Sequence, residues 1–115
     1  MPFDALAVLQ AAVTKTATFN GTGFDLQTRA PLRGVAVSID VTAVSGTSPT
    51  CTFIVQESSD NSTFNDHAST AEVTAVGKHQ VQVTTNKRYV RLRAVIGGTT
   101  PSFDYSARFQ ETRGL

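Results

Sequence analysis

Hydrophobic side chains recur at every second residue over much of the chain, which is the period of a β-strand with one buried face. The clearest run spans residues 35–42, and the same alternation returns in 51–55, 81–83, 89–96 and 103–110. The apolar members of these runs, which we expect to face the interior, are Val35, Val37, Ile39, Val41, Cys51, Phe53, Val55, Val81, Val83, Val90, Leu92, Ala94, Ile96, Phe103, Tyr105, Ala107 and Phe109. Polar clusters separate the runs, so we predict an all-β, antiparallel two-sheet sandwich, jelly-roll-like, with about eight strands.

A Gly-Thr-x-Pro turn occurs twice, at residues 46–49 and 98–101. Glycine and proline clusters between alternating runs indicate strand connections, and we expect the second turn to close a C-terminal hairpin of 89–96 with 103–110. The repetition invites a duplication hypothesis. However, aligning Gly46 on Gly98 places apolar Val41 opposite Arg93, so the strand phases disagree and the turns are similar without being parts of a repeat.

The N-terminal dozen residues fit two structures. Leu6, Leu9 and Val13 have helical spacing with Asp4 as a possible N-cap, whereas Leu6 and Val8 also alternate as in an extended segment. We therefore expect residues 1–12 to be an N-terminal arm or short helix, and residues 13–115 to be the single β-sandwich domain.

Length, charge and cysteine content narrow the class of protein. The 115 residues suffice for one domain with a two-layer core, and the formal net charge of +1 gives no broad attraction to nucleic acid or anionic membrane. The single cysteine cannot form an internal disulfide. Asp4 stands where a signal peptide carries basic residues, and the apolar stretch 5–13 is too short to span a membrane. We expect synthesis in a cytoplasm and no nucleic-acid or membrane partner.

The sequence shows no combination of residues that is typical of a catalytic site. Cys51 lies in phase with Phe53 and Val55 and is expected to point into the core, as free cysteines usually do. His67 and His79 stand in different polar segments and are expected to be surface histidines rather than catalytic bases. We predict that the protein is not an enzyme and has no cofactor.

A calcium loop is the strongest candidate metal site. Asp60, Ser62 and Asp66 have the offsets of the early ligands, but Asn65 replaces the required glycine and Ala71 the bidentate glutamate. Two separated histidines and one cysteine are too few for a closed zinc site. We therefore predict no metal, and a turn whose Asp and Asn cap their own backbone.

Basic side chains cluster at one place, where Arg88, Arg91 and Arg93 follow Lys87. We call these three arginines the arginine face. Two interpretations stay open: ordinary solvated charge or ion pairing with Asp104 or Glu57, or a docking face for an acidic protein surface, for which arginine is the favoured residue.

The order of motifs along the chain is itself informative. In sequence these are Phe3–Ala5, Gly23–Leu26, Pro31–Val37, Gly46–Thr50, Val55–Phe64, Lys87–Leu92 and Gly98–Ser102. This series resembles small structural proteins of tailed bacteriophages, in particular capsid decoration (cement) proteins with a jelly-roll fold. The resemblance implies a virion protein made in the bacterial cytoplasm and located on the capsid exterior. It further implies binding to the major capsid protein, and a homo-oligomer, dimer or trimer, on a capsid symmetry axis.

Three contact regions follow as hypotheses from this reading. They are the N-terminal arm, the arginine face and the two turn tips, and their candidate interface residues are Pro2, Phe3, Leu6, Leu9, Arg88, Arg91, Arg93, Pro49 and Pro101. Two alternatives remain. One is another virion sandwich of the tail or baseplate. The other is a discoidin-like carbohydrate-binding module, which Val55–Phe64 and Arg88–Leu92 also resemble, although such modules usually bind sugars with exposed tryptophan or tyrosine and this chain has no tryptophan.

Overall fold

A computed structural model describes residues 8–25 and 32–111, which form strands and turns without any helix. No helix able to cross a membrane is therefore present in these two ranges. The strands are β1 (Val8–Lys15), β2 (Phe19–Asn20), β3 (Phe24–Asp25), β4 (Leu32–Ser58), β5 (Asn65–Ser69), β6 (Gly77–Thr85) and β7 (Tyr89–Glu111). The predicted all-β class is thus confirmed.

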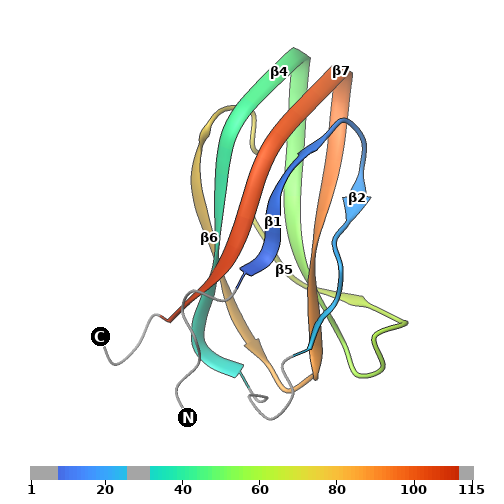
Figure 1. Cartoon of the computed structure of the whole chain (residues 1–115), viewed down its shortest axis with the longest axis vertical. Coiled ribbons are helices and arrows are strands. Elements are labelled where there is room, and N and C mark those ends of the chain that lie inside the picture. Colours follow the sequence, from blue (N-terminus) through green and yellow to red (C-terminus); the bar gives the residue numbers. More distant parts are fainter. Residues whose placement is uncertain (1–7, 26–31, 112–115) are drawn as a thin grey trace.

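Strands β4 and β7 form a long two-stranded ribbon that is folded in half. They run antiparallel and stay paired from Val35 opposite Glu111 to Ser58 opposite Tyr89. Midway, near Thr47 of β4 opposite Thr99 of β7, the two strands bend over together, as the upper end of Figure 1 shows. Each strand consequently contributes one half to each side of the molecule.

The folded ribbon supplies the two central strands of both layers. In the first layer, residues 35–45 of β4 and 102–111 of β7 are flanked by β6 and β1. In the second layer, residues 51–58 of β4 and 89–96 of β7 are flanked by β5 on one side and by β2 and β3 on the other. The result is the antiparallel two-layer sandwich that the alternation predicts, with seven strands among the described residues where we expected about eight.

Apolar side chains from both layers fill the space between them. Tyr105 of the first layer packs edge-on against Phe53 of the second with ring centroids 4.9 Å apart, and Phe109 packs similarly against Phe24 at 5.0 Å. The buried core residues are Leu9, Val37, Ile39, Val41, Cys51, Phe53, Val55, Val73, Val81, Val83, Val90, Leu92, Ala94, Phe103, Tyr105, Ala107 and Phe109. Burial of a Val, Leu or Phe side chain contributes roughly 1.5–3 kcal/mol, so this interior is the main source of stability.

Two glycines allow the ribbon to fold over. Gly46 and Gly98 have φ of 113° and 110°, values that side chains disfavour. A Cβ on Gly46 would lie 2.6 Å from the carbonyl oxygen of Thr100, and one on Gly98 would lie 2.6 Å from that of Ser48. Ser48 and Thr100 themselves have φ of 49° and 45°. The two turns are therefore conformational equivalents that face each other, although the strand phases around them differ.

The predicted C-terminal hairpin is wrong. Residues 89–96 and 103–110 belong to the single bent strand β7, and their neighbours are β4, β1, β2 and β3 rather than each other. The turn at 98–101 thus carries the chain from one layer to the other. A hairpin turn and a fold-over turn share the same glycine and proline chemistry, so the local sequence does not distinguish them.

The predicted N-terminal arm is also corrected in part. Residues 8–12, which we assigned to an arm or short helix, lie in β1 and pair with β7, where Val8 lies opposite Arg108 and Gln10 opposite Ala107. Residues 1–7 lie outside the described residues. The unpaired edge of β7 in the first layer offers backbone hydrogen bonds, and these favour a strand over the helix that the spacing allows.

Candidate functional site

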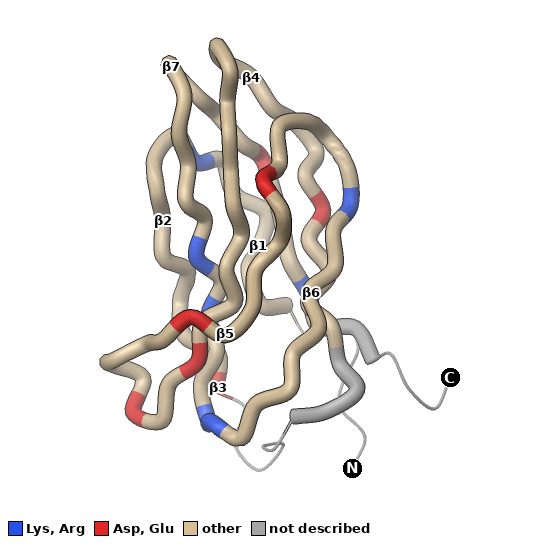
Figure 2. The backbone as a smooth tube through the Cα atoms, turned by 180° about the vertical axis from the view of Figure 1, so that it is seen from behind, with Lys and Arg blue, Asp and Glu red and all other residues tan. Residues whose placement is uncertain are grey.

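The outer surface of the second layer carries two members of the arginine face, Arg91 and Arg93. Along β7, Tyr89, Arg91 and Arg93 project to the same side, because Val90, Leu92 and Ala94 between them are buried. Gln56 and Ile54 of β4 lie directly opposite Arg91 and Arg93. Figure 2 shows basic positions along the strand beside β2 and acidic positions gathered near β5.

Arg91 is held by a neutral amide and an aromatic ring. Its Nε donates to Oε1 of Gln56 at 2.8 Å, and its guanidinium lies 4.1 Å from the ring centroid of Phe64. Gln56 is only 6% exposed, and its Nε2 donates to Oδ1 of Asp66 at 2.8 Å. Desolvation and the neighbouring Arg93 lower the pKa of Arg91. The guanidinium is thus fixed in place and stays charged, because an arginine pKa lies far above neutral.

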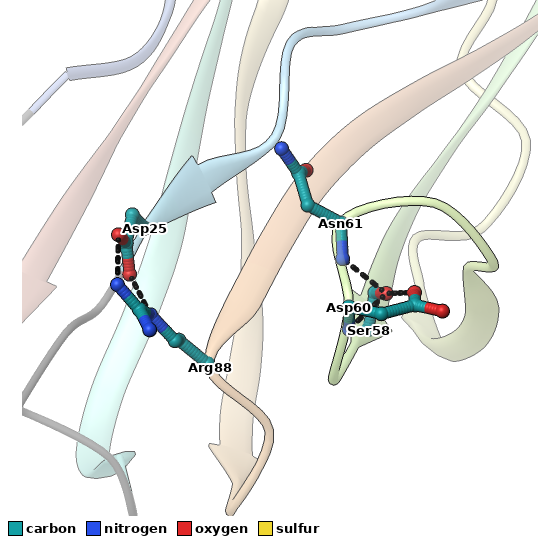
Figure 3. A network of polar contacts seen from close by, with 5 residues as sticks. All are labelled: Asp25, Ser58, Asp60, Asn61 and Arg88. Carbon is teal, nitrogen blue, oxygen red and sulfur yellow. Dashed lines mark hydrogen bonds and ion pairs between the residues drawn. The ribbon is translucent and has the colours of Figure 1, made fainter.

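Arg93 and Arg88 differ in what balances their charge. Nη1 of Arg93 donates to Oδ1 of Asn20 at 2.9 Å, again a neutral acceptor. Arg88 instead forms a two-bond ion pair with Asp25 at 2.8 and 2.9 Å, and this pairing raises the pKa of Arg88 (Figure 3). Arg88 therefore forms its ion pair at the edge of the sheet, with β3. Arg91 and Arg93 lie on the outer surface and are bonded to neutral amides instead.

Asp104 and Glu57, which one of the two open interpretations offered as ion-pair partners of the arginines, contact other residues. Asp104 accepts a hydrogen bond from the Thr14 hydroxyl at 2.7 Å. Glu57 accepts one from the Thr85 hydroxyl and lies 3.4 Å from Nδ1 of His67. Neither acid pairs with an arginine among the described residues, because these acidic side chains contact residues of β1, β5 and β6 instead.

The predicted turn tips come together at one end of the sandwich. Pro49 and Pro101 are both partly exposed, and each is approached closely by the glycine of the opposite turn. A Cβ on Gly98 would lie 3.0 Å from Cα of Pro49, and one on Gly46 would lie 2.9 Å from Cα of Pro101. The two tips are thus one joint surface rather than two separate ones.

The candidate contact residues of the arm have different outcomes. Leu9 is 6% exposed and belongs to the core, so its assignment as an interface residue is corrected. Pro2, Phe3 and Leu6 lie outside the described residues, and their contact role stays a prediction.

The groups that could perform catalysis are engaged in the fold. Cys51 is buried, and desolvation raises the pKa of its thiol to about 12, which suppresses the reactive thiolate. Nε2 of His67 accepts the backbone N–H of Thr84 at 3.2 Å, so this histidine joins β5 to β6. Nε2 of His79 is buried without a hydrogen-bond partner among the described residues. Cys51, His67 and His79 thus lie in separate places within the strands, each surrounded by residues of the fold.

The turn after β4 is capped by Asp60 as we predicted, while the backbone N–H of Asn61 donates to Oγ of Ser58 at 2.9 Å. Oδ1 of Asp60 accepts the N–H groups of Ser62 and Thr63 at 2.9 and 3.0 Å and the Ser58 hydroxyl at 2.8 Å, and these bonds lower the pKa of Asp60. Figure 3 shows Ser58, Asp60 and Asn61 forming this turn. Within residues 8–25 and 32–111, no group of three or more His, Cys, Asp and Glu side chains is arranged to hold a metal ion.

Sequence reasoning missed the neutral partners of the arginines. Gln56 lies directly across the ladder from Arg91, and Asn20 directly across from Arg93. Phe64 reaches Arg91 from the turn before β5. Strand register places Gln56 and Asn20 beside the arginines. No local motif in the sequence predicts this placement.

Comparison with known proteins gives one family. Residues 5–103 match the family described as "Uncharacterised protein YqxG N-terminal domain". No curated protein matches the chain.

Proposed function

The chain belongs to the YqxG N-terminal domain family, since the match covers most of its length. We propose that it is a structural virion protein of a tailed bacteriophage, because the order of its motifs resembles that of capsid decoration proteins. Its role under this proposal is that of a capsid decoration protein. It binds the lattice of the major capsid protein from outside, as a homo-oligomer on a symmetry axis, and stabilises the head.

One observation carries the proposal: the arginine face presents two fixed guanidinium groups whose partners are amides. Arg91 and Arg93 donate to Gln56 and Asn20, so their positive charge is oriented without being cancelled by a directly bonded carboxylate. Arginine and tyrosine are the residue types that dominate binding energy at protein interfaces. An acidic protein surface fits this face, which lies on the outer side of the second layer.

Further support comes from the architecture and from the order of motifs. The order of motifs resembles capsid decoration proteins, as described above. The folded ribbon connects both layers, because β4 and β7 each run through both of them. The thiol of Cys51, which we considered as a nucleophile, is buried and its pKa is raised. A sandwich of this kind is a suitable rigid block for bridging neighbouring capsid subunits.

Co-sedimentation with undecorated capsids of the same virus tests the proposal. We expect saturable binding in a fixed ratio to capsid subunits, a higher capsid melting temperature, and weaker binding as salt rises, because exposed charge pairs are screened. The double variant Arg91→Gln and Arg93→Gln should weaken binding about tenfold or more, as expected when charged interface contacts are removed.

The matched control is Arg108→Gln, which removes an exposed arginine from the outer side of the first layer. This variant should bind like the unmodified protein. Absence of saturable binding would overturn the proposal and favour a tail component or a carbohydrate module, which a glycan array would then distinguish. If the Arg108→Gln control lost as much capsid binding as the Arg91→Gln and Arg93→Gln double variant, the arginine face would not be the contact.

A further inference from the structure

The guanidinium groups of Arg91 and Arg93 turn toward opposite sides of β7. In this half of β7, β4 pairs along one edge of the strand and β2 along the other. Arg91 donates to Gln56 of β4 at 2.8 Å, whereas Arg93 donates to Asn20 of β2 at 2.9 Å. The two positive groups therefore diverge across the sheet, although both residues lie on one face of the same strand.

This divergence sets the distance between the two charges. Residues two apart on a strand are separated by about 6.8 Å, and neighbouring strands by about 4.8 Å. Arg91 and Arg93 are displaced both along β7 and across it, because each is bonded to the residue directly opposite it on a different strand. Together these displacements place the two guanidinium groups on the order of 10 Å apart.

Each guanidinium keeps a pair of N–H donors for a ligand. Nε of Arg91 is taken by Gln56, and within residues 8–25 and 32–111 its two Nη groups donate to no other side chain or backbone. Nη1 of Arg93 bonds to Asn20, while Nε and Nη2 of Arg93 have no acceptor in the same ranges. Both side chains are partly exposed. Two adjacent N–H donors match the two oxygens of one carboxylate, so each arginine alone is a complete carboxylate site.

We propose that Arg91 and Arg93 form two separate carboxylate sites that recognise an acidic partner segment carrying two carboxylates on the order of 10 Å apart. One small anion does not serve both sites, because its oxygens would have to lie about 2.8 Å from donors of both side chains. The inference rests on the proposed function, in which the partner is the capsid protein, and it specifies how the acids of that partner are spaced.

Spacing then selects the partner as well as charge. Once the first carboxylate of a correctly spaced pair is bound, the second binds at a high effective concentration. Two acids that lie closer together reach only one arginine at a time and lose this gain. Gln56 and Asn20 are positioning residues in this arrangement, since their amides hold the two guanidinium groups apart.

Dicarboxylates of different length test the spacing without any capsid. Suberate and malonate carry the same two carboxylates at long and short separation, and octanoate carries one carboxylate on a chain as long as that of suberate. NMR titrations of the full-length protein follow the side-chain resonances of Arg91 and Arg93. We expect both arginines to follow one suberate binding curve, with a dissociation constant about fivefold or more below those for malonate and octanoate.

Three variants show whether the two sites act as described. Arg91→Gln and Arg93→Gln should each reduce suberate affinity to that of octanoate, because one site remains. Asn20→Ala keeps every charge and alters an exposed side chain, but it releases Arg93. It should lower the preference for suberate over malonate about threefold or more. Arg108→Gln, in the other layer, is the control for general loss of charge and should leave the preference unchanged.

Two results would overturn the inference. One is equal affinity of the unmodified protein for suberate and malonate. The other is inorganic phosphate that binds more tightly than suberate and is lost in either single arginine variant, because that result shows one shared anion site. The capsid role fails separately: suberate binding as expected, with no binding to capsids, would contradict the proposed function and leave the two carboxylate sites in place.

Discussion

Gly46 and Gly98 show how single residues decide whether the ribbon can fold over. Each has a positive φ, and each lies against the backbone of the opposite turn, so no side chain can be added without moving main chain. Asp60 shows a different single-residue effect. Its carboxylate replaces three hydrogen bonds that the turn after β4 would otherwise make with water.

Gly46→Ala should destabilise the protein by about 2 kcal/mol or more, because the new Cβ combines strained backbone with a close contact to Thr100. Urea denaturation measures this change. Gly77→Ala is the control, since the nearest atom to its Cβ would be Nε2 of His79 at 3.9 Å and its φ lies outside the positive region. A Gly46→Ala protein as stable as Gly77→Ala would contradict the fold-over geometry.

Asp60 should contribute to the pH dependence of stability in the acid range. Its pKa is lowered in the folded state by hydrogen bonds from Thr63, Ser62 and Ser58. Its contribution is therefore present above the unfolded-state pKa of about 3.9 and is lost as the pH falls through the lower folded-state value. Thermal melts between neutral pH and strong acid should show the stability difference between the unmodified protein and Asp60→Asn shrinking below that range.

Asp40→Asn is the matched control for the loss of a carboxylate, because Asp40 lies in β4 away from the turn at Asp60. Its stability at neutral pH should stay within about 0.5 kcal/mol of the unmodified protein, as is usual for surface substitutions. If the Asp60→Asn difference stayed constant down to strong acid, the capping bonds would not be the source of acid sensitivity.

At the scale of elements, β1 illustrates how an available edge determines secondary structure. The spacing of Leu9 and Val13 suits a helix, yet β7 offers an unpaired edge and an open part of the core beneath it. Strand β1 pairs with this edge and covers this part of the core. Leu9 is buried, and Val8 is 47% exposed on the opposite side. The segment is therefore part of the sandwich from Val8 onward.

Leu9→Ala should destabilise the isolated protein by about 2–5 kcal/mol, the usual cost of truncating a buried leucine. Val8→Ala is the neighbouring control and should cost under about 0.5 kcal/mol, as surface substitutions usually do. Chemical denaturation of both variants without any partner decides the matter. Equal stability of the two variants would return Leu9 to the role of an arm contact.

At the scale of the whole molecule, the folded ribbon makes the two layers interdependent. Each of β4 and β7 runs through both layers, and Tyr105 of one layer packs on Phe53 of the other. Neither layer has a complete set of strands without the other. Separate unfolding of one layer would break the ribbon at its fold and expose the shared core.

Unfolding should accordingly be a single cooperative transition. Under native conditions, the amides of Val37 in the first layer and Val55 in the second should exchange with the same free energy of opening, equal to the global value. Hydrogen exchange followed by NMR across a denaturant series measures both. Two distinct opening free energies for these amides would show that the layers unfold independently.

The sequence by itself determined the buried faces of the alternating strands, although not strand β1, whose spacing also suited a helix. Alternation of apolar and polar residues depends only on the pleat of each strand, so Val37, Ile39, Phe53 and Leu92 could be assigned to the core without knowing any strand neighbour. The same applies to the turn at Asp60, because its hydrogen bonds join residues close together in sequence.

The tertiary structure alone decided which strands pair and what the charged side chains contact. The turn at 98–101 could close a hairpin or carry the chain between layers, and only the long pairing of β4 with β7 selects the second. Likewise, Gln56 and Asn20 become partners of Arg91 and Arg93 through strand register. Long-range pairing is set by the combined burial of all strands, which no local segment of the sequence contains.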